Sequence, residues 1–205
     1  MSSPQSPLAY NISTKIPPNF VDSFDAPTKL HQAGTYSLDD SRDSNIAWLS
    51  ASHWLVAWVQ AYLTTMNNTY FCYDLTNIDA GNAQYTEYTK EQYFKWHTDA
   101  EANLINLMIE PTMPGQGMSI DQVVRSEANK AQYIRKLSFT LQLSHPDEYE
   151  GGELQLLYNH KTLITTPKEY GMLTIFDSRI PHRVRKIKSG MRKSLVGWMV
   201  GPRWK

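Results

Sequence analysis

The triplet His97-Thr98-Asp99 combines two residue types that bind metal ions. In a β-strand, residues two positions apart project to the same face, so the imidazole and the carboxylate would point together. They would supply two of the ligands of a metal site. An isolated His-x-Asp triplet is also a common surface pair, so the hypothesis depends on what the rest of the chain adds.

A third ligand is offered by His182, which follows Pro181, opens the segment HRVRKI and comes just after the apolar segment LTIFD. Two imidazoles and one carboxylate on one face of an octahedron are the ligand set of non-heme Fe(II) oxygenases, and they leave three positions open. The other four histidines lack a comparable context and are interpreted as structural: His31, His53, His145 and His160.

Arg192 and Ser194 open the last apolar segment, RKSLVGWMVG, and would face the same way. A guanidinium beside a hydroxyl is a good receptor for a carboxylate, because arginine donates two parallel hydrogen bonds and keeps its charge. A dicarboxylic cosubstrate could therefore chelate iron at one end and be anchored by Arg192 at the other.

The second half of the chain predicts the scaffold for these residues. Residues 136–144, KLSFTLQLS, alternate between apolar and polar positions, which is typical of a strand with one face on a core. The polar face makes Gln142 a candidate for the wall of the site. Further short segments follow, separated by Gly, Pro, Asp or Ser: ELQLLY, TLITTP, YGMLTIFD, HRVRKI and RKSLVGWMVG. Serial short strands indicate an all-β sandwich, jelly roll or barrel.

The N-terminal part predicts a helix that supports this β-structure. From Ser44, apolar residues recur at steps of three and four, so we expect an amphipathic helix that Asp43 or Ser44 caps and that Asn67 and Asn68 end. Its tryptophans are expected to pack on a sheet as a core stripe: Trp48, Trp54 and Trp58. After the helix, YFCYDL, QYTEY and QYFKWHTD predict short strands.

Length and composition limit the possible classes. The 205 residues suit a single domain, 1–205, with helical support over about 1–70 and a β-core over about 71–203. The 20 basic and 20 acidic residues cancel, which gives no global reason to expect nucleic acid or an anionic membrane as partner. With one cysteine, no signal-peptide pattern and no apolar run of about 18 residues, we expect a soluble, cytoplasmic protein.

The Pro- and Gly-rich stretch within 110–129 suggests a long connection. Long connections in compact domains are often binding loops or lids, so we expect this segment to cover the substrate.

Several of these segments together resemble a known family. HTD at 97–99, GMLTIFDSRIPHRV at 171–184 and GMRKSLVGW at 190–198 are similar to the Fe(II)- and 2-oxoglutarate-dependent dioxygenases of the prolyl 4-hydroxylase type. RKLSFTLQLSHPDEYEGGELQL, at 135–156, resembles the bacterial and phage hydroxylases called PKHD-type. The resemblance covers roughly 42–203 and implies a double-stranded β-helix, the jelly-roll or cupin-like fold.

Carried over by position, the resemblance makes His97, Asp99 and His182 the iron ligands. It makes Arg192, assisted by Ser194, the partner of the distal carboxylate of 2-oxoglutarate, and Tyr88 a residue that faces this cosubstrate. Many relatives have glycine where YTKEQ has Glu91. Since glycine takes φ > 0 without strain, its loss predicts a different turn before the iron-bearing strand.

The resemblance implies hydroxylation of an unactivated C–H bond with Fe(II), 2-oxoglutarate, O2 and supporting ascorbate, and with succinate and CO2 as co-products. The family suggests a peptidyl proline, for which three aromatic residues could form a wall unless they belong to the core: Trp96, Tyr93 and Tyr85. A free amino acid, another small metabolite or a nucleobase would use the same iron site. The rival class is a non-catalytic cupin-like binding module, although the chain keeps all four key residues.

The basic segment RVRKIKSGMRK leaves a nucleic-acid substrate open, but its alternating part RVRKIK is interpreted as a solvated strand face. The substrate and the oligomeric state stay open.

Overall fold

A computed structural model describes residues 9–17, 29–33, 41–79, 82–100, 133–159 and 161–204. The expected lid, 110–129, lies outside these residues. Nearly all regular structure in the described ranges is β-strand, with one α-helix, α2 (Trp54–Met66). In these ranges, no helix has the length and apolar character needed to cross a bilayer.

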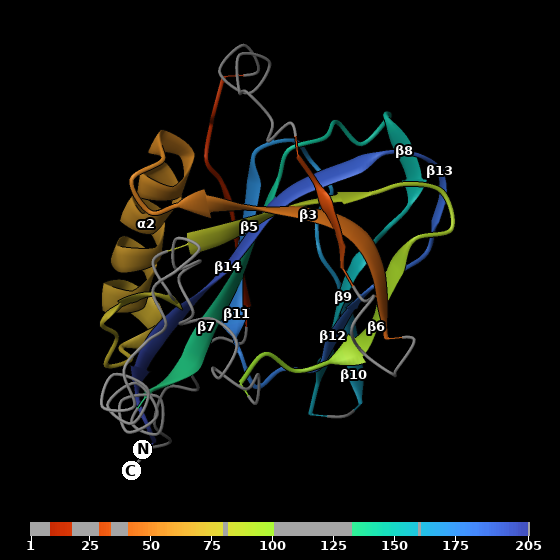
Figure 1. Cartoon of the computed structure of the whole chain (residues 1–205). Helices are drawn as coiled ribbons and strands as arrows, with labels where there is room; N and C mark the ends of the chain where they lie inside the picture. Colours follow the sequence, from red (N-terminus) through yellow and green to blue (C-terminus); the bar gives the residue numbers. More distant parts are fainter. Residues whose placement is uncertain are drawn as a thin grey trace, which may run out of the picture.

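Twelve strands of the described chain form one antiparallel sheet that curls back on itself (Figure 1). The pairing order is β1-β11-β7-β14-β5-β3-β6-β12-β9-β10, while β2 pairs with β3 and β4 pairs with β14; β13 and β8 form a separate pair. The strands are β1 (Ala9–Ser13), β2 (His31–Ala33), β3 (Arg42–Ser50), β4 (Asn77–Ile78), β5 (Asn82–Tyr88), β6 (Tyr93–His97), β7 (Tyr133–Gln142), β8 (Tyr149–Gly151), β9 (Leu154–Tyr158), β10 (Thr162–Thr165), β11 (Met172–Asp177), β12 (His182–Val184), β13 (Ile187–Gly190) and β14 (Arg192–Pro202).

The long strand β3 joins the two walls of the curled sheet. Its residues 45–50 pair with β5 in the first wall, whereas Arg42 and Asp43 pair with β6 in the second. The wall of β11, β7, β14 and β5 therefore faces the wall of β6, β12, β9 and β10 across the interior of the fold (Figure 1). This is the predicted jelly-roll arrangement.

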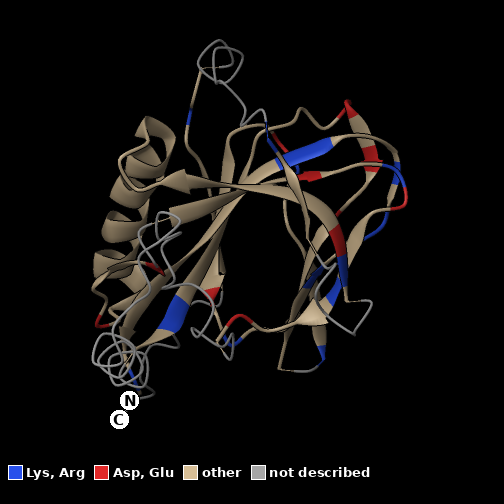
Figure 2. Cartoon of the chain, viewed as in Figure 1, with Lys and Arg blue, Asp and Glu red and all other residues tan. Residues whose placement is uncertain are grey.

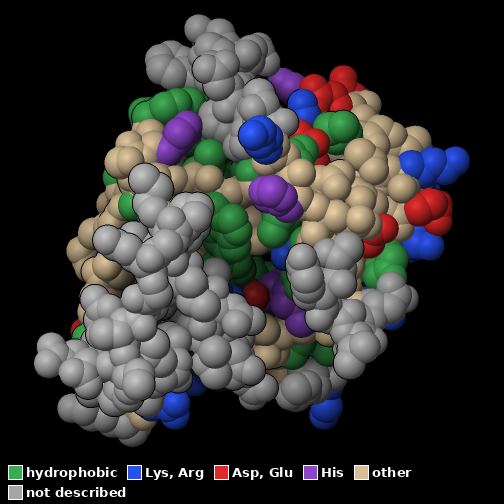
Figure 3. Space-filling view, in the orientation of Figure 1, with side chains coloured by type: hydrophobic (Ala, Val, Ile, Leu, Met, Phe, Trp, Pro, Cys, Tyr) green, Lys and Arg blue, Asp and Glu red, His purple; other side chains and the backbone are tan. Residues whose placement is uncertain are grey.

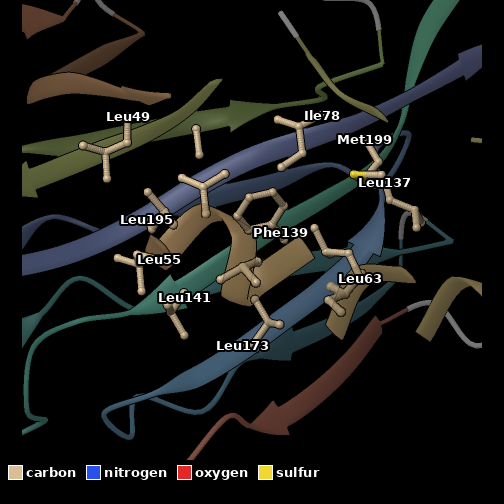
Figure 4. Close-up of a cluster of buried hydrophobic side chains, with 14 of the residues drawn as sticks. Leu49, Leu55, Leu63, Ile78, Leu137, Phe139, Leu141, Leu173, Leu195 and Met199 are labelled. Carbon is tan, nitrogen blue, oxygen red and sulfur yellow. The ribbon is translucent and has the colours of Figure 1, made fainter. Parts of the chain in front are cut away.

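The main core lies between the first wall and α2 (Figure 4). The helix has no charged residue, as Figure 2 shows, and its buried stripe contains Leu55, Val59 and Leu63. Leu137, Phe139 and Leu141 of β7, with Leu195 of β14, face this stripe. Burial of each such side chain is worth about 1.5–3 kcal/mol, so this layer fixes which face of β7 and β14 points away from the interior.

The predicted helix start at residue 44 is wrong, because residues 42–50 form β3. The apolar residues of this segment alternate: Ala47 and Leu49 face the core, and Trp48 lies on the opposite face. The backbone groups of β3 instead form hydrogen bonds with β5 on one side and with β2 on the other. The helix begins after His53, whose Nδ1 accepts a hydrogen bond from Leu55 N at 3.2 Å. Residues before 71 thus supply three strands in addition to the helix.

The expectation that three tryptophans form a core stripe is also wrong. Trp48, Trp54 and Trp58 are 42%, 40% and 42% exposed. On α2 the buried stripe instead consists of smaller side chains, so the two helical tryptophans lie beside it rather than in it.

Two strand predictions need correction. YFCYDL is not a strand, since the π-helix η1 (Asn67–Phe71) continues α2 and residues 72–76 are irregular. HRVRKI divides into β12 and β13, because the chain leaves the main sheet after Val184 to pair with β8. The strands expected for QYTEY, QYFKWHTD, KLSFTLQLS, ELQLLY, TLITTP, YGMLTIFD and RKSLVGWMVG are present as β5, β6, β7, β9, β10, β11 and β14.

Candidate metal centre

The interior face of the first wall is polar, although its other face is apolar. Strand register places Arg192 opposite Tyr88, and Ser194 between Thr86 of β5 and Gln142 of β7. The predicted alternation of β7 is confirmed, but both of its faces are buried. Polar side chains enclosed in this way need partners or ligands, so the interior is where a site is expected.

The three predicted metal ligands meet at one end of this interior. Strands β6 and β12 are antiparallel neighbours, and His97 pairs directly with His182. Asp99 Oδ1 lies 3.7 Å from His97 Nε2, and Asp99 Oδ2 lies 3.3 Å from His182 Nε2. Ligand atoms of the three residues all lie within 4.8 Å of one another. Histidine and carboxylate surfaces meet at the bottom of a hollow near the middle of Figure 3.

Backbone contacts orient both imidazoles. His97 Nδ1 is 2.8 Å from the Lys95 carbonyl oxygen, and His182 Nδ1 is 3.0 Å from the Ile180 carbonyl oxygen. A hydrogen on each Nδ1 would fix the tautomer and leave the Nε2 lone pair for a metal. Phe94 stacks on His97 with ring centroids 3.5 Å apart, which restricts ring rotation.

Two serines hold Asp99 in position, and the sequence analysis did not predict this role for either of them. The Ser138 hydroxyl donates to Asp99 Oδ2 at 2.6 Å and lies 2.9 Å from Ser178 Oγ. The Asp99 backbone N–H donates to the Ser178 carbonyl at 3.0 Å. The only advance signal for Ser138 was its place on the polar face of β7.

The protonation states of His97 and Asp99 suit metal binding. Burial, with a contribution from His182, lowers the pKa of His97 to about 4, so this imidazole is neutral at pH 7. Burial alone would raise the pKa of Asp99, but His182 and the Ser138 hydrogen bond outweigh it and lower the pKa below its usual range. A neutral imidazole and an ionised carboxylate are the forms that bind metals. Burial alone would lower the pKa of His182, but the Asp99 carboxylate outweighs it and raises that pKa, so a metal ion must displace a proton there.

Arg192 lies in the same cavity as the three ligands and is 1% exposed. Its Nη1 donates to Ser194 Oγ at 3.1 Å, while Nε and Nη2 have no partner. No described carboxylate forms an ion pair with it. A buried guanidinium without an anion is costly, so the site is built for an anionic ligand.

Comparison with known proteins agrees with this geometry. The family model of the 2OG-Fe(II) oxygenase superfamily matches residues 83–200, which include all three ligands and Arg192. The chain belongs to the 2OG-Fe(II) oxygenase superfamily. A PKHD-type hydroxylase from Hyphomonas neptunium is 39% identical over 84 residues, 40% of this chain and 36% of the relative. The matched part spans about a third of the length of such curated relatives.

Solved structures show the same fold at low sequence identity. A Pseudomonas putida prolyl-4-hydroxylase is 18% identical with a TM-score of 0.62, covering 96% of this chain and 93% of its own. The viral collagen prolyl hydroxylase of Paramecium bursaria Chlorella virus-1 is also 18% identical, with a TM-score of 0.63 and coverage of 95% and 97%. The predicted jelly roll and the predicted family are confirmed.

Glu91 stands where the resemblance implies glycine, and it adopts a glycine-like backbone conformation instead of the expected different turn. Glu91 has φ of 72°, the left-handed conformation that glycine favours. Its N–H donates to the Ile187 carbonyl at 2.9 Å, which helps hold the turn. Tyr88 lines the cavity, and its ring centroid is 5.7 Å from the guanidinium carbon of Arg192.

We expect the Glu91→Gly variant to be more stable than Glu91→Ala by about 1 kcal/mol, because a left-handed non-glycine residue costs about 1–2 kcal/mol. Both variants lose the exposed ion pair with Lys186, so their difference isolates the backbone. Urea unfolding of the two variants measures it. Equal midpoints would mean that the turn holds no strain.

The cavity also contains residues that sequence reasoning missed. Phe94, Trp198, Arg42 and Gln84 line it together with the ligands, and Thr140 lines it where Gln142 was expected. For Gln84, Thr140 and Trp198 the signal was periodicity, because each lies an even number of residues from a predicted site residue on its own strand. Phe94 and Arg42 pair with each other across β6 and β3 and carried no such signal.

Three other aromatic residues, for which the sequence left a substrate wall or core packing open, do not line this cavity. Tyr85 packs in the main core, and Trp96 is 40% exposed with the Arg183 guanidinium 4.6 Å from its ring. Tyr93 is half-buried outside this cavity.

Two of the four histidines interpreted as structural make contacts that support this interpretation, His53 and His145. His53 caps α2, His145 stacks on Tyr170, and His31 is exposed on β2, whereas His160 lies outside the described residues.

Replacement of Ser138 by alanine is expected to weaken Fe(II) binding by about 10- to 100-fold, because the partners that orient metal ligands have effects of this size. Anaerobic titration with Fe(II) measures the change, and the exposed Ser189→Ala is the matched control. An unaltered affinity in Ser138→Ala would show that Asp99 needs no such support.

Proposed function

We propose that this protein is an Fe(II)- and 2-oxoglutarate-dependent oxygenase that hydroxylates an unactivated C–H bond and releases succinate and CO2. The observation that carries the proposal is the combination within one cavity of a His-Asp-His cluster and a buried Arg192 with two unpartnered donors.

The residues present fit both groups. His97, Asp99 and His182 would hold the iron through two Nε2 atoms and a carboxylate oxygen, a donor set suited to Fe(II) with open positions. Arg192 and Ser194 would bind the distal carboxylate of 2-oxoglutarate, and Tyr88 would face that cosubstrate. When bound, iron and cosubstrate supply the oxidising chemistry with O2.

The chain's own contribution is to bind, orient and exclude water. Arg192 fixes the far end of the cosubstrate, which sets where its keto end lies relative to the three ligands. Ser138 and the carbonyls of Lys95 and Ile180 hold the ligands in position. Leu154, Val184 and Val196 supply apolar lining that limits access of water to the site.

As substrate we propose a peptidyl proline. Phe94 and Trp198 give the cavity an aromatic lining, although His97 and Arg42 contact the Phe94 ring and Arg135 contacts the Trp198 ring. Arg42, which donates to Gln84 Oε1 at 2.7 Å, would also bond a main-chain carbonyl. Two structural neighbours are named as prolyl hydroxylases, and this supports the choice. A free amino acid, a small metabolite or a nucleobase is the alternative within the same chemistry.

A nucleic-acid substrate finds less support on the surface. Three of the six basic residues in 183–193 form ion pairs: Arg185 with Glu153 at 3.8 Å, Lys186 with Glu91 at 3.0 Å and Lys188 with Glu150 at 2.6 Å. Figure 2 shows acidic residues interspersed with the basic ones around β8 and β13. Such a surface does not form the basic stripe that tracks a phosphate backbone.

The test is made on anaerobic protein with Fe(II) and 2-oxoglutarate. We expect a metal-to-ligand charge-transfer band and, after O2 is admitted, succinate; both should be absent in His182→Ala. Proline-containing peptides, L-proline, other amino acids and nucleosides are then screened for a mass gain of one oxygen atom. Folded, iron-loaded protein without the band would favour the non-catalytic cupin-like module.

A further inference from the structure

Arg192 and Tyr149 each carry buried polar atoms without a well-formed hydrogen bond in the protein: Nε and Nη2 of Arg192 and the hydroxyl of Tyr149. Tyr149 is 5% exposed and opens β8, a strand outside the main sheet. A buried hydroxyl without a hydrogen bond costs free energy, so its retention needs a reason.

Gly152 shows how close Tyr149 lies to Arg192. A Cβ placed on Gly152 would lie 3.2 Å from Arg192 Cδ and 3.3 Å from Tyr149 Cε2. Both side chains therefore border the same residue from β8 and β14. Arg192 lies near enough to the Tyr149 hydroxyl to lower its pKa, partly by hydrogen bonding, but the geometry leaves Nε and Nη2 of Arg192 without a well-formed bond, so both side chains can still donate to a shared ligand.

The tyrosine ring is fixed, which makes its hydroxyl a well-placed donor. It packs in the second hydrophobic cluster with Leu154 and Ile187. Lys168 Nζ lies 4.2 Å from the ring centroid and also donates to the Gly151 carbonyl at 3.0 Å. Burial raises the pKa of Tyr149, and the nearby Arg192 only partly offsets this, so the hydroxyl keeps its proton at neutral pH.

We propose that Tyr149 is a further cosubstrate-binding residue, whose hydroxyl donates a hydrogen bond to the distal carboxylate that Arg192 holds. This inference rests on the proposed function. A carboxylate accepts about four hydrogen bonds, and the two unpartnered nitrogens of Arg192 supply only two. The Tyr149 hydroxyl supplies another, and it selects for 2-oxo acids that carry a second carboxylate.

The variant Tyr149→Phe tests the proposal because it removes the hydroxyl and keeps the ring. The lost group has no well-formed hydrogen bond in the protein, so the variant should be at least as stable as the parent without ligand. We expect its Kd for 2-oxoglutarate, measured by anaerobic titration of the charge-transfer band, to rise about tenfold or more, as befits a hydrogen bond to a charged group.

The discriminating probe is 2-oxovalerate, which has the same chain length but lacks the distal carboxylate. Its affinity should be equal in the parent and in Tyr149→Phe. The matched control is Tyr133→Phe, an exposed tyrosine on β7, which should leave both affinities unchanged.

The outcomes separate the two proposals. If the parent binds neither 2-oxo acid, the proposed function fails and this inference with it. If the parent binds 2-oxoglutarate and Tyr149→Phe binds it equally well, only the role of Tyr149 is overturned. Equal losses for 2-oxoglutarate and 2-oxovalerate also overturn it, because Tyr149 would then act on the metal site or the fold.

Discussion

Asp99→Asn is expected to abolish succinate formation and to weaken Fe(II) binding by well over the roughly 100-fold seen when only a supporting residue is lost. The substitution keeps the size of the side chain but removes the charge that offsets that of a divalent cation. Asp99 is also the residue between the two imidazoles, at 3.7 and 3.3 Å from their Nε2 atoms. Fe(II) binding is measured by anaerobic metal titration, and succinate is assayed after O2 is admitted.

Asp147→Asn, in the exposed turn before β8, is the matched control and should behave as the parent. The neutral imidazole of His97 means that Asp99→Asn still presents two nitrogen ligands, so residual weak binding is compatible with the proposal. An Asp99→Asn protein with the parent's iron affinity and turnover would contradict it.

Arg192→Met is expected to have two opposite effects. Affinity for 2-oxoglutarate should fall by about 100- to 4,000-fold, since loss of one member of a buried charge pair costs about 3–5 kcal/mol. Stability without cosubstrate should be unchanged or higher, because methionine removes a 1% exposed cation that has no anionic partner among the described residues. The band titration gives the first quantity and urea unfolding the second.

Stabilisation by cosubstrate supplies an independent readout. Excess 2-oxoglutarate with Fe(II) should raise the Tm of the parent, because a ligand of the native state stabilises it, but not that of Arg192→Met. Arg185→Met, a surface arginine near Glu153, is the control. A less stable Arg192→Met protein that binds 2-oxoglutarate normally would assign Arg192 a purely structural role.

Local chemistry could be predicted where spacing and strand geometry suffice. Arg192 and Ser194 are two residues apart on β14, so the β-strand period places them together. Asp99 lies past the end of β6, in a bend that still brings its carboxylate to His97, so the predicted proximity holds although the predicted strand geometry does not. The alternation of 136–144 similarly predicted which face of β7 meets the core, and the structure agrees.

The same reasoning failed where two periodicities compete. Apolar residues between 44 and 66 fit helical steps, yet residues 42–50 pair with β5 and β2 as a strand. Pairing partners distant in sequence decided this segment, and one-dimensional periodicity carries no information about them. The tryptophans were misplaced for the same reason, since the buried stripe of α2 is set by the sheet it covers.

The sequence by itself determined the residue types and local spacing of the candidate site, and with them the family and the fold class. Only the tertiary structure decided that His182 lies beside His97, that Ser138 holds Asp99, and that Arg192 shares its surroundings with Tyr149. The physical reason is that curling of the sheet brings together strands far apart in the chain. Burial in that interior then turns ordinary polar side chains into groups that need a ligand.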